Sequence, residues 1–184
     1  MRIIVGITGA SGAVYGITIL EYLKLRQIET HLVISRWAER TIELETGYRP
    51  EQVAALAYRC YESDDMAAAV SSGSFLHNGM VIAPCSMKTL ASIASGFSDN
   101  LIARAADVTI KEGKKLVLMP RETPLSAIHL ENMLKLARIG VAIMPPVPAF
   151  YNRPAEVGDI VKQSVGRALD LLGIENDLFR RWSG

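Results

Sequence analysis

The feature that most constrains this chain is an apolar run followed at once by a glycine-rich turn, within residues 1–16 (MRIIVGITGASGAVYG). The run Ile3-Ile4-Val5 is short and β-branched, which is typical of a strand buried in a parallel sheet. After the turn, apolar residues recur at helical spacing from Val14 to Leu23. The stretch therefore predicts a strand, a tight turn and a helix, and the free N–H groups at the start of that helix would suit a phosphate.

The spacing of the glycines favours a mononucleotide over a dinucleotide. The turn reads GxxGxxG from Gly6 to Gly12, whereas the dinucleotide fingerprint reads GxGxxG. A dinucleotide site would also require an acidic residue after the second strand to hold a ribose, and this chain has Ser35 there. We therefore expect FMN rather than NAD, although glycines between a strand and a helix also serve close packing alone.

Strand and helix patterns alternate along the whole chain, which predicts an α/β fold with a parallel sheet covered by helices on both faces. The expected strands cover residues 3–5, 30–35, 58–61, 80–83, 116–119 and 141–144. The expected helices cover residues 13–26, 37–45, 51–57, 64–70, 90–95, 100–112, 124–139 and 156–172. Ser98 or Asp99 is expected to cap the helix at 100–112, and Thr123 with Pro124 is a start signal for the next helix. We expect one domain over residues 1–184, with a tail from about residue 174.

Composition limits the partners that this chain can bind. With 184 residues it can bury a substantial core without disulfides or metals, and a formal net charge of +1 gives no basic field for nucleic acid or an anionic membrane. Cys60 and Cys85 form neither a CxxC pair nor a Cys/His cluster, so we expect reduced thiols. The sequence opens directly into a strand and has no apolar run of membrane-spanning length. We therefore expect an unprocessed, cytoplasmic protein.

The candidate site residues follow the strands, because the ligand of an open parallel sheet lies beyond the carboxyl ends of the strands. These segments supply Ser11, Ser35, Ser86 with Thr89, Arg121 with Glu122, and Tyr151 with Arg153. Hydroxyl and guanidinium groups thus gather where a phosphorylated ligand would lie. Simpler roles stay open: Ser86 and Thr89 as helix caps, Lys88 as a solvated side chain, and Arg121 with Glu122 as an ion pair.

Two other catalytic classes lack the residues that they need. His31, His77 and His129 fall on separate segments and compose no site. The chain has no HExxH motif and no GxSxG elbow, so metal-dependent hydrolysis and serine-triad chemistry are poorly supported. No metal site is expected.

Several longer motifs together point to one family. The chain resembles the UbiX-type flavin prenyltransferases, also described as phenolic or aromatic acid decarboxylase subunits. The likeness covers nearly the whole chain and rests on TGASGAVYG at 8–16, PCSMKTLASIASG at 84–96, DNLIARAADVTIKE at 99–112, PRETPLSAIHLENMLKL at 120–136 and PAFY at 148–151. The resemblance implies a single-domain, Rossmann-like flavoprotein fold.

The resemblance also implies an activity. A dimethylallyl group would pass from dimethylallyl monophosphate to N5 and C6 of reduced FMN, without a metal, and the prenylated FMN would serve a partner UbiD-type aromatic acid decarboxylase. The residues implied to bind FMN are Gly9, Ala10, Ser11, Ser35, Ser86, Met87, Lys88, Thr89 and Arg121. Those implied to bind the prenyl donor are Lys111, Arg121, Tyr151, Arg167 and Trp182. Those implied in catalysis are Ser11, Glu45, Lys111 and Glu122.

Elementary chemistry agrees with these implied roles. Departure of phosphate from an allylic carbon develops negative charge, which Lys111, Arg121 and Arg167 could stabilise. Glu122 could relay protons as the new ring closes. Arg104 also matches an arginine of the family, but its place on a helix fits a structural ion pair equally well.

Two alternatives remain beside the resemblance. Flavin-dependent cysteine decarboxylases share the expected fold, but residues 62–72 lack the histidine that they use, and Pro145-Pro146-Val147-Pro148 stands in place of their Asn-bearing loop. A noncatalytic FMN-binding or delivery protein is the second alternative, and the number of cations argues against it. Because relatives form large homo-oligomers, we expect a homo-oligomer, a dodecamer as in relatives, in which Tyr151 and Arg167 could complete a neighbour's site.

Overall fold

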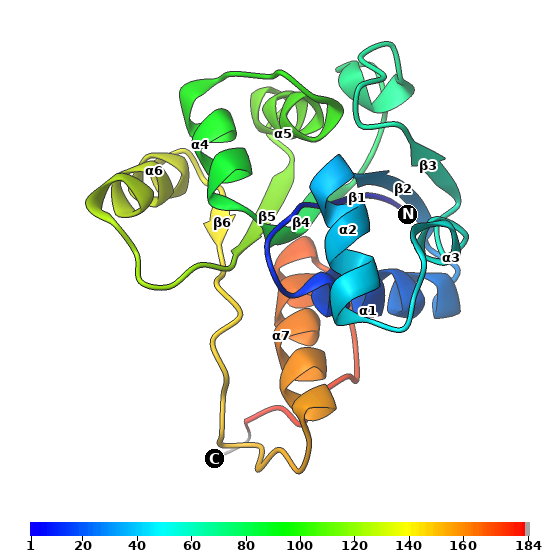
Figure 1. Ribbon diagram of the computed structural model, residues 1–184, viewed down its shortest axis with the longest axis vertical. Coiled ribbons are helices and arrows are strands. Elements are labelled where there is room, and N and C mark those ends of the chain that lie inside the picture. The colour runs from blue at the N-terminus through cyan, green and yellow to red at the C-terminus, as the bar shows by residue number, and fades with distance from the viewer. Residues whose placement is uncertain (183–184) are drawn as a thin grey trace.

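The sheet of this chain is parallel throughout in the computed structural model, which describes residues 1–182. Within these residues the strand order is β3-β2-β1-β4-β5-β6 (Figure 1). The strands are β1 (Arg2–Ile7), β2 (Glu29–Ile34), β3 (Arg59–Tyr61), β4 (Gly79–Cys85), β5 (Lys115–Pro120) and β6 (Ala142–Ile143). The chain changes its direction of travel across the sheet between β1 and β4, which creates a crevice at the carboxyl ends of these two strands.

Helices cover both faces of the sheet (Figure 1). They are α1 (Ala13–Leu25), α2 (Arg36–Glu45), α3 (Pro50–Ala54), α4 (Met87–Ser95), α5 (Leu101–Lys111), α6 (Ala127–Arg138) and α7 (Val157–Leu172), with a short 3-10 helix, η1 (Ala69–Ser71). One buried cluster joins the sheet to α1, α2 and α7, and a second joins its other face to α4, α5 and α6. The predicted α/β fold is confirmed.

The position of β1 at the centre of the sheet explains why its sequence is apolar without interruption. Ile3, Val5 and Ile7 of β1 belong to the cluster with α1 and α7, whereas Ile4 belongs to the cluster on the opposite face. Each of these four side chains is fully buried. Full burial of such a side chain stabilises the fold by about 1.5–3 kcal/mol, so the run that opens the sequence supports both layers.

Gly16 lets α1 lie directly on the sheet. A Cβ atom added at this position would collide with the carbonyl oxygen of Ala83 in β4 and would lie 2.9 Å from the side chain of Ile7. The helix backbone therefore packs against the main chain of β4, and only glycine fits at that contact.

Three local predictions were wrong. Residues 64–70 form turns that lead into η1 rather than a helix, because the Asp65 carboxylate accepts from the N–H of Ala67 and closes a local turn. The cap of α5 is Asn100, whose side chain accepts from Ala103 N, and not Ser98 or Asp99.

The helix expected to start at Thr123 and Pro124 begins later, at Ala127. The hydroxyl of Ser126 accepts from His129 N at 3.2 Å, and Nδ1 of His129 accepts from Ser126 N at 3.3 Å. This reciprocal pair satisfies the first turn of α6, so the start of the helix is fixed at Ser126.

An arm and a tail extend from the sheet along α7. The arm, residues 144–156, runs from β6 to the start of α7, and the tail, residues 174–182, returns beside that helix (Figure 1). Asn176 donates from Nδ2 to the carbonyl oxygen of Gly166 at 3.0 Å. A Cβ atom at Gly166 would lie 2.5 Å from the ring of Phe179, so the tail packs closely on this part of α7. The last two residues of the predicted tail, 183–184, lie outside the described residues.

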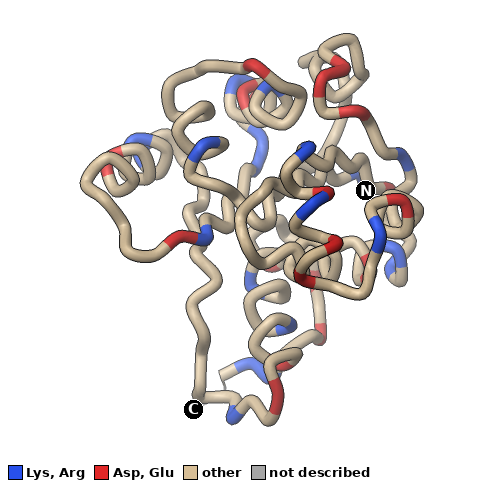
Figure 2. Tube along the Cα trace, viewed as in Figure 1, with Lys and Arg blue, Asp and Glu red and all other residues tan. Residues whose placement is uncertain are grey.

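Acidic and basic residues are interspersed along the chain (Figure 2). None of the helices within residues 1–182 is long and apolar enough to cross a lipid bilayer. Over the same residues, no group of three or more His, Cys, Asp and Glu side chains is arranged to hold a metal ion.

Candidate functional site

Thr8 joins the two turns that border the crevice. Its hydroxyl donates to the carbonyl oxygen of Pro84 at 2.8 Å and accepts from Ser86 N at 2.7 Å. Main-chain hydrogen bonds join the neighbouring turns as well, since Ser35 N donates to Ile7 O and Arg121 N donates to Cys85 O. The segments after β2, β1, β4 and β5 therefore lie side by side, as predicted for the residues that follow these strands. Thr8 belongs to the recognised turn motif, but no role for it was predicted.

Glu45 caps the start of α1 from the end of α2. Its Oε2 accepts from Gly12 N at 2.7 Å and from Ala13 N at 3.3 Å. Gly12, at φ +104°, precedes the helix and supplies no side-chain cap of its own. The sequence predicted a phosphate at the start of α1, but in the structure the Glu45 carboxylate accepts the first N–H groups of this helix. The sequence did identify Glu45 as a site residue, but only through the resemblance.

A cleft of about 530 Å³ lies beside this cap. Its lining residues are Ser11, Gly12, Val14, Tyr15, Glu45, Arg121, Pro146, Val157 and Val161. Burial raises the pKa of the Tyr15 phenol. The Nε of Arg121 is buried and has no hydrogen-bond partner within residues 1–182. The cleft thus combines apolar walls with a donor that lacks an acceptor, and three of the predicted site residues, Ser11, Glu45 and Arg121, line it together.

The start of α4 presents hydroxyl groups next to the same crevice. Ser86 caps the helix by accepting from Thr89 N at 3.3 Å and also donates to the Thr89 hydroxyl at 3.1 Å. The first turn of α4 contains no acidic residue. Lys88 is exposed, and its Nζ lies 3.6 Å from Asp99 Oδ2. The capping role left open for Ser86 is therefore confirmed, while Lys88 forms a solvated ion pair.

Two of the predicted catalytic residues stand apart from the cleft lining. Glu122 is exposed and accepts from Thr123 N at 2.9 Å, and no ion pair joins it to Arg121 among the described residues. Lys111 ends α5 at the amino-end edge of the sheet, opposite to the crevice, since β5 begins four residues later. Its Nζ contacts Glu112 Oε1 at 2.5 Å, and this contact lowers the pKa of Glu112. A single chain does not bring Lys111 to the cleft.

The predicted donor-binding residues Tyr151, Trp182 and Arg167 lie on the arm, the tail and α7. The rings of Tyr151 and Trp182 meet edge to face, with centroids 5.8 Å apart. Arg167 of α7 donates from Nη1 to Asp170 Oδ2 at 3.0 Å. Arg104 has a structural role, since it donates to Ser71 O and to Asp107.

Comparisons with known proteins identify the family of this chain. The sequence matches the model of the Flavoprotein family over residues 1–169. It is 58% identical over 183 residues to the mitochondrial flavin prenyltransferase PAD1 of Saccharomyces cerevisiae, and the match covers 100% of this chain and 76% of that protein.

Two crystal structures are similar over the whole chain. AnUbiX (PadA1) in complex with FMN and dimethylallyl pyrophosphate has a TM-score of 0.98 and 56% identity, with 100% of this chain and 97% of that chain covered. A dodecameric FMN-dependent UbiX-like decarboxylase from Escherichia coli O157:H7 has a TM-score of 0.98 and 57% identity, with 100% of both chains covered.

Proposed function

We propose that this chain, which belongs to the flavoprotein family and within it to the UbiX-like flavin prenyltransferases, transfers a dimethylallyl group to N5 and C6 of reduced FMN. The donor is dimethylallyl monophosphate, and phosphate leaves as the new carbon–nitrogen bond forms. The observation that carries the proposal is the buried Arg121 Nε without a partner at the wall of the cleft.

The cleft fits a flavin in size and chemistry. Its volume of about 530 Å³ lies within the range of about 300–1,000 Å³ that is usual for small-molecule sites. Val14, Val157 and Val161 offer apolar surface to a flat ring. The edge of a flavin ring carries carbonyl oxygens and ring nitrogens, which are the acceptors that Arg121 Nε lacks.

We assign the FMN phosphate to the start of α4 rather than to the start of α1. The Glu45 carboxylate already accepts from the first N–H groups of α1, and its negative charge would repel a phosphate. At α4, the hydroxyls of Ser86 and Thr89 accompany a helix start with no acidic residue. The positive end of that helix favours an anion there. Gly9, Ala10 and Ser35 flank the same crevice.

The remaining site residues act on charge and protons. When bound, reduced flavin supplies the nucleophilic N5 and C6. Arg121 and Arg167 balance the negative charge that develops on the departing phosphate. Glu122 accepts one hydrogen bond at Oε1. Its carboxyl group would give a proton to the double bond of the prenyl group and take up the proton that C6 loses as the ring closes, so that no net proton is consumed. Ser11 lines the cleft and orients the ring.

We further propose a homo-oligomer whose subunits share this site. One chain keeps the cleft, the arm residue Tyr151 and Lys111 at separate places. The arm also exposes large apolar side chains, with Val147 and Phe150 each 70% exposed. A UbiX-like relative of similar structure is described as dodecameric. A neighbouring subunit would therefore bring Lys111, or Tyr151 with Arg167, to the cleft.

The test is the mass of the flavin after anaerobic incubation with reduced FMN and dimethylallyl monophosphate, with the pyrophosphate as a parallel donor. We expect the wild-type protein to add one dimethylallyl unit, and Arg121→Met to lose most of its FMN binding. An unmodified flavin with both donors would contradict the proposed reaction. Carbon dioxide released from an acid without any donor would instead support the decarboxylase alternative.

A second experiment isolates the proton transfer. Glu122→Gln should leave FMN affinity unchanged and slow formation of the cyclised product by roughly a hundredfold, the size expected when a positioned acid–base group is lost. Glu131→Gln, an exposed residue of α6, makes the same charge change away from the cleft and should have no effect. An unchanged rate in Glu122→Gln would overturn the role of Glu122 alone.

Three broader assignments complete the proposal. The prenylated FMN serves a UbiD-type decarboxylase, because such a modified cofactor is useful only to an enzyme that binds it. The chain works as one domain over residues 1–184. We place it in the cytoplasm, where its free thiols Cys60 and Cys85 stay reduced.

A further inference from the structure

Two residues outside the predicted site connect the residues expected to bind the prenyl donor. Arg181 precedes Trp182, and its Nη1 and Nη2 donate to Asp170 Oδ2 and Oδ1 at 3.0 and 2.7 Å. Arg167 Nη1 donates to the same Oδ2 at 3.0 Å. Trp182 in turn meets Tyr151 edge to face. A continuous path therefore runs from Tyr151 to Arg167, and Asp170 is one of the points where the tail and α7 meet.

We propose that Asp170 is a positioning residue for the prenyl donor: its carboxylate fixes Arg167 and, through Arg181, holds the tail so that Trp182 stays against Tyr151. The proposal rests on the function given above, because that function is what assigns Tyr151, Arg167 and Trp182 to the donor.

The surroundings of Asp170 suit this role. Its side chain is only 17% exposed, whereas the side chains of Arg167 and Arg181 are 50% and 54% exposed. Asn176 also donates from Nδ2 to Asp170 Oδ1 at 3.0 Å. The hydrogen bonds and charge of Arg181, followed by the charge of Arg167, lower the pKa of Asp170. The carboxylate is therefore ionised at neutral pH and is held from three directions.

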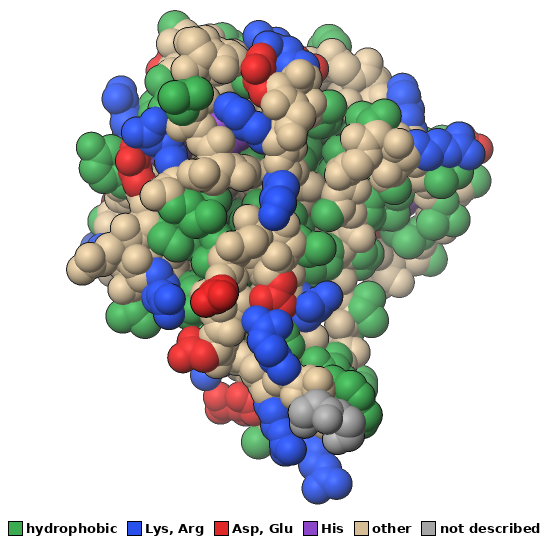
Figure 3. Space-filling model, turned by 180° about the vertical axis from the view of Figure 1, so that it is seen from behind, with side chains coloured by type: hydrophobic (Ala, Val, Ile, Leu, Met, Phe, Trp, Pro, Cys, Tyr) green, Lys and Arg blue, Asp and Glu red, His purple; other side chains and the backbone are tan. Residues whose placement is uncertain are grey.

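The charges at this point leave a cation available for a phosphate. Two guanidinium groups share one carboxylate, so the group of three carries a net charge of +1, and the nearby Glu175 carboxylate acts on Arg181. Arg167 uses one of its five N–H donors on Asp170, and a phosphate oxygen can accept from others. Without the carboxylate, the two guanidinium groups would repel each other and separate. Toward the tapered end of the molecule, Lys and Arg side chains lie among Asp and Glu side chains (Figure 3).

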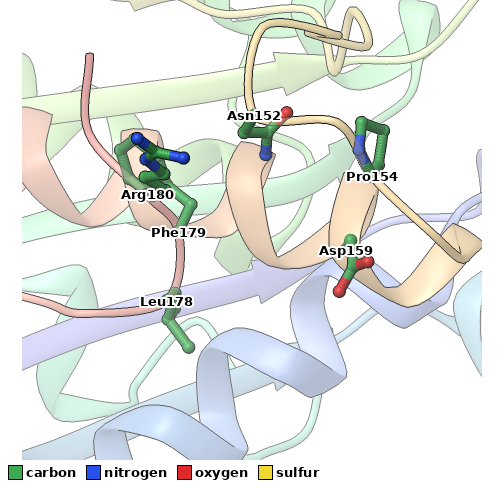
Figure 4. A pocket seen from close by; sticks show the side chains of 6 residues that line it. All are labelled: Asn152, Pro154, Asp159, Leu178, Phe179 and Arg180. Atoms are coloured by element: carbon green, nitrogen blue, oxygen red, sulfur yellow. The ribbon is translucent and has the colours of Figure 1, made fainter. Parts of the chain in front are cut away.

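The tail packs on α7 through Ile174, Leu178 and Phe179, but it does not pack continuously against the arm. A cavity of about 200 Å³ separates Leu178, Phe179 and Arg180 of the tail from the arm, where Asn152 and Pro154 lie opposite (Figure 4).

The contacts between the tail and α7 lie at two different places along the tail. Asn176 and Phe179 attach it to Gly166, several residues before Trp182. The pair of Arg181 with Asp170 is the attachment next to Trp182. Loss of that pair should release the end of the tail and leave its beginning in place.

The test compares Asp170→Asn with Asp177→Asn in the prenyl-transfer assay. Asp177 is exposed in the same tail and has no ion pair among the described residues, so its replacement controls for the loss of one negative charge. For Asp170→Asn we expect the KM for dimethylallyl monophosphate to rise about tenfold, the effect of about one charge-assisted hydrogen bond. The kcat at saturating donor and the FMN affinity should stay close to wild type, because Arg167 keeps its charge and Asp170 does not line the cleft.

Arg181→Gln provides a second variant that leaves α7 unaltered and should raise the same KM. A spectroscopic readout accompanies both variants. The chain has two tryptophans, so Trp37→Phe makes Trp182 the sole tryptophan. With excitation selective for tryptophan, its anisotropy should fall with Asp170→Asn and Arg181→Gln but not with Asp177→Asn.

The outcomes separate the inference from the proposed function. If wild type forms prenylated flavin and both Asp170→Asn and Arg181→Gln keep its KM, the role of Asp170 is refuted while the function stands. If wild type forms no prenylated flavin from either donor, the function is refuted and this role of Asp170 with it. A raised KM with reduced Trp182 anisotropy supports the inference.

Discussion

Replacing Glu45 tests whether a residue at the end of one helix stabilises the start of another. Oε2 of Glu45 accepts from two N–H groups of α1, at 2.7 and 3.3 Å. An N-cap together with a negative charge at a helix start contributes about 1–2 kcal/mol. Glu45 also stands at the C-terminal end of α2, where no basic residue accompanies it and where a negative charge costs about 0.3–0.5 kcal/mol. The net contribution is therefore about 1 kcal/mol.

The expected effect can be measured as a change in Tm. For a chain of this length, 1 kcal/mol corresponds to about 2–4 °C. Glu45→Ala should lower Tm by about that amount, and Glu45→Gln by about half, because an amide oxygen still accepts one hydrogen bond without the charge. All melts should be run at one protein concentration, since the Tm of an oligomer depends on concentration.

Glu43→Gln is the matched control. Glu43 lies in the same last turn of α2, but it pairs only with Arg40 at the surface, at 2.9 Å, and such a pair contributes about 0.3–0.5 kcal/mol. Its replacement should leave Tm within about 1 °C of wild type. The stability lost with the ion pair is offset by the stability gained when a negative charge is removed from the C-terminal end of α2. Equal shifts for Glu43→Gln and Glu45→Gln would refute the capping role.

Two further predictions concern packing and pH. Gly16→Ala should destabilise the fold by about 1–3 kcal/mol, because the new methyl group meets the main chain of β4. Gly47→Ala, at a position with open space around it, should melt close to wild type; equal melting of the two variants would contradict the packing argument. The pKa of Asp170 is lowered in the folded state, mainly by Arg181, so its contribution to stability is present above its unfolded pKa of about 4. That contribution should be lost as pH falls through the lower, folded pKa, and Asp170→Asn should lack this part of the acid transition in a pH-dependent melt.

Much of the fold could be predicted from local pattern. The β-branched run of β1 and the alternation of strands with helices fixed the sheet type, because a strand buried on both faces must be apolar throughout. The segment 64–70 could not be placed in this way, since Asp65 prefers a local turn over a helix. The start of α6 was misplaced because Ser126 and His129 form a reciprocal cap that a proline signal at 124 obscured.

The candidate site was predictable only in part. The rule that ligands lie at the carboxyl ends of parallel strands predicted Ser11 and Arg121 as site residues, and both line the cleft. The cap by Glu45 spans 33 positions, and no local pattern reports a contact at that separation. Asp170 was missed for a related reason, because a carboxylate three residues after Arg167 reads as an ordinary helical ion pair until the tail brings Arg181 to it.

The sheet ends at both edges in very short strands, and this limits how chains can associate. β3 has 3 residues and β6 has 2, so little unpaired main chain is offered for strand addition from another molecule. Next to β6, α6 displays Ile128, Leu130 and Leu134, which are 68%, 52% and 51% exposed, while Leu136 is its one buried residue within this fully described helix. Self-association through α6 would thus bury the exposed apolar side chains of this helix against another chain. The short edge strands also make fibril growth through the sheet edges unfavourable before a newly made chain has assembled with other chains.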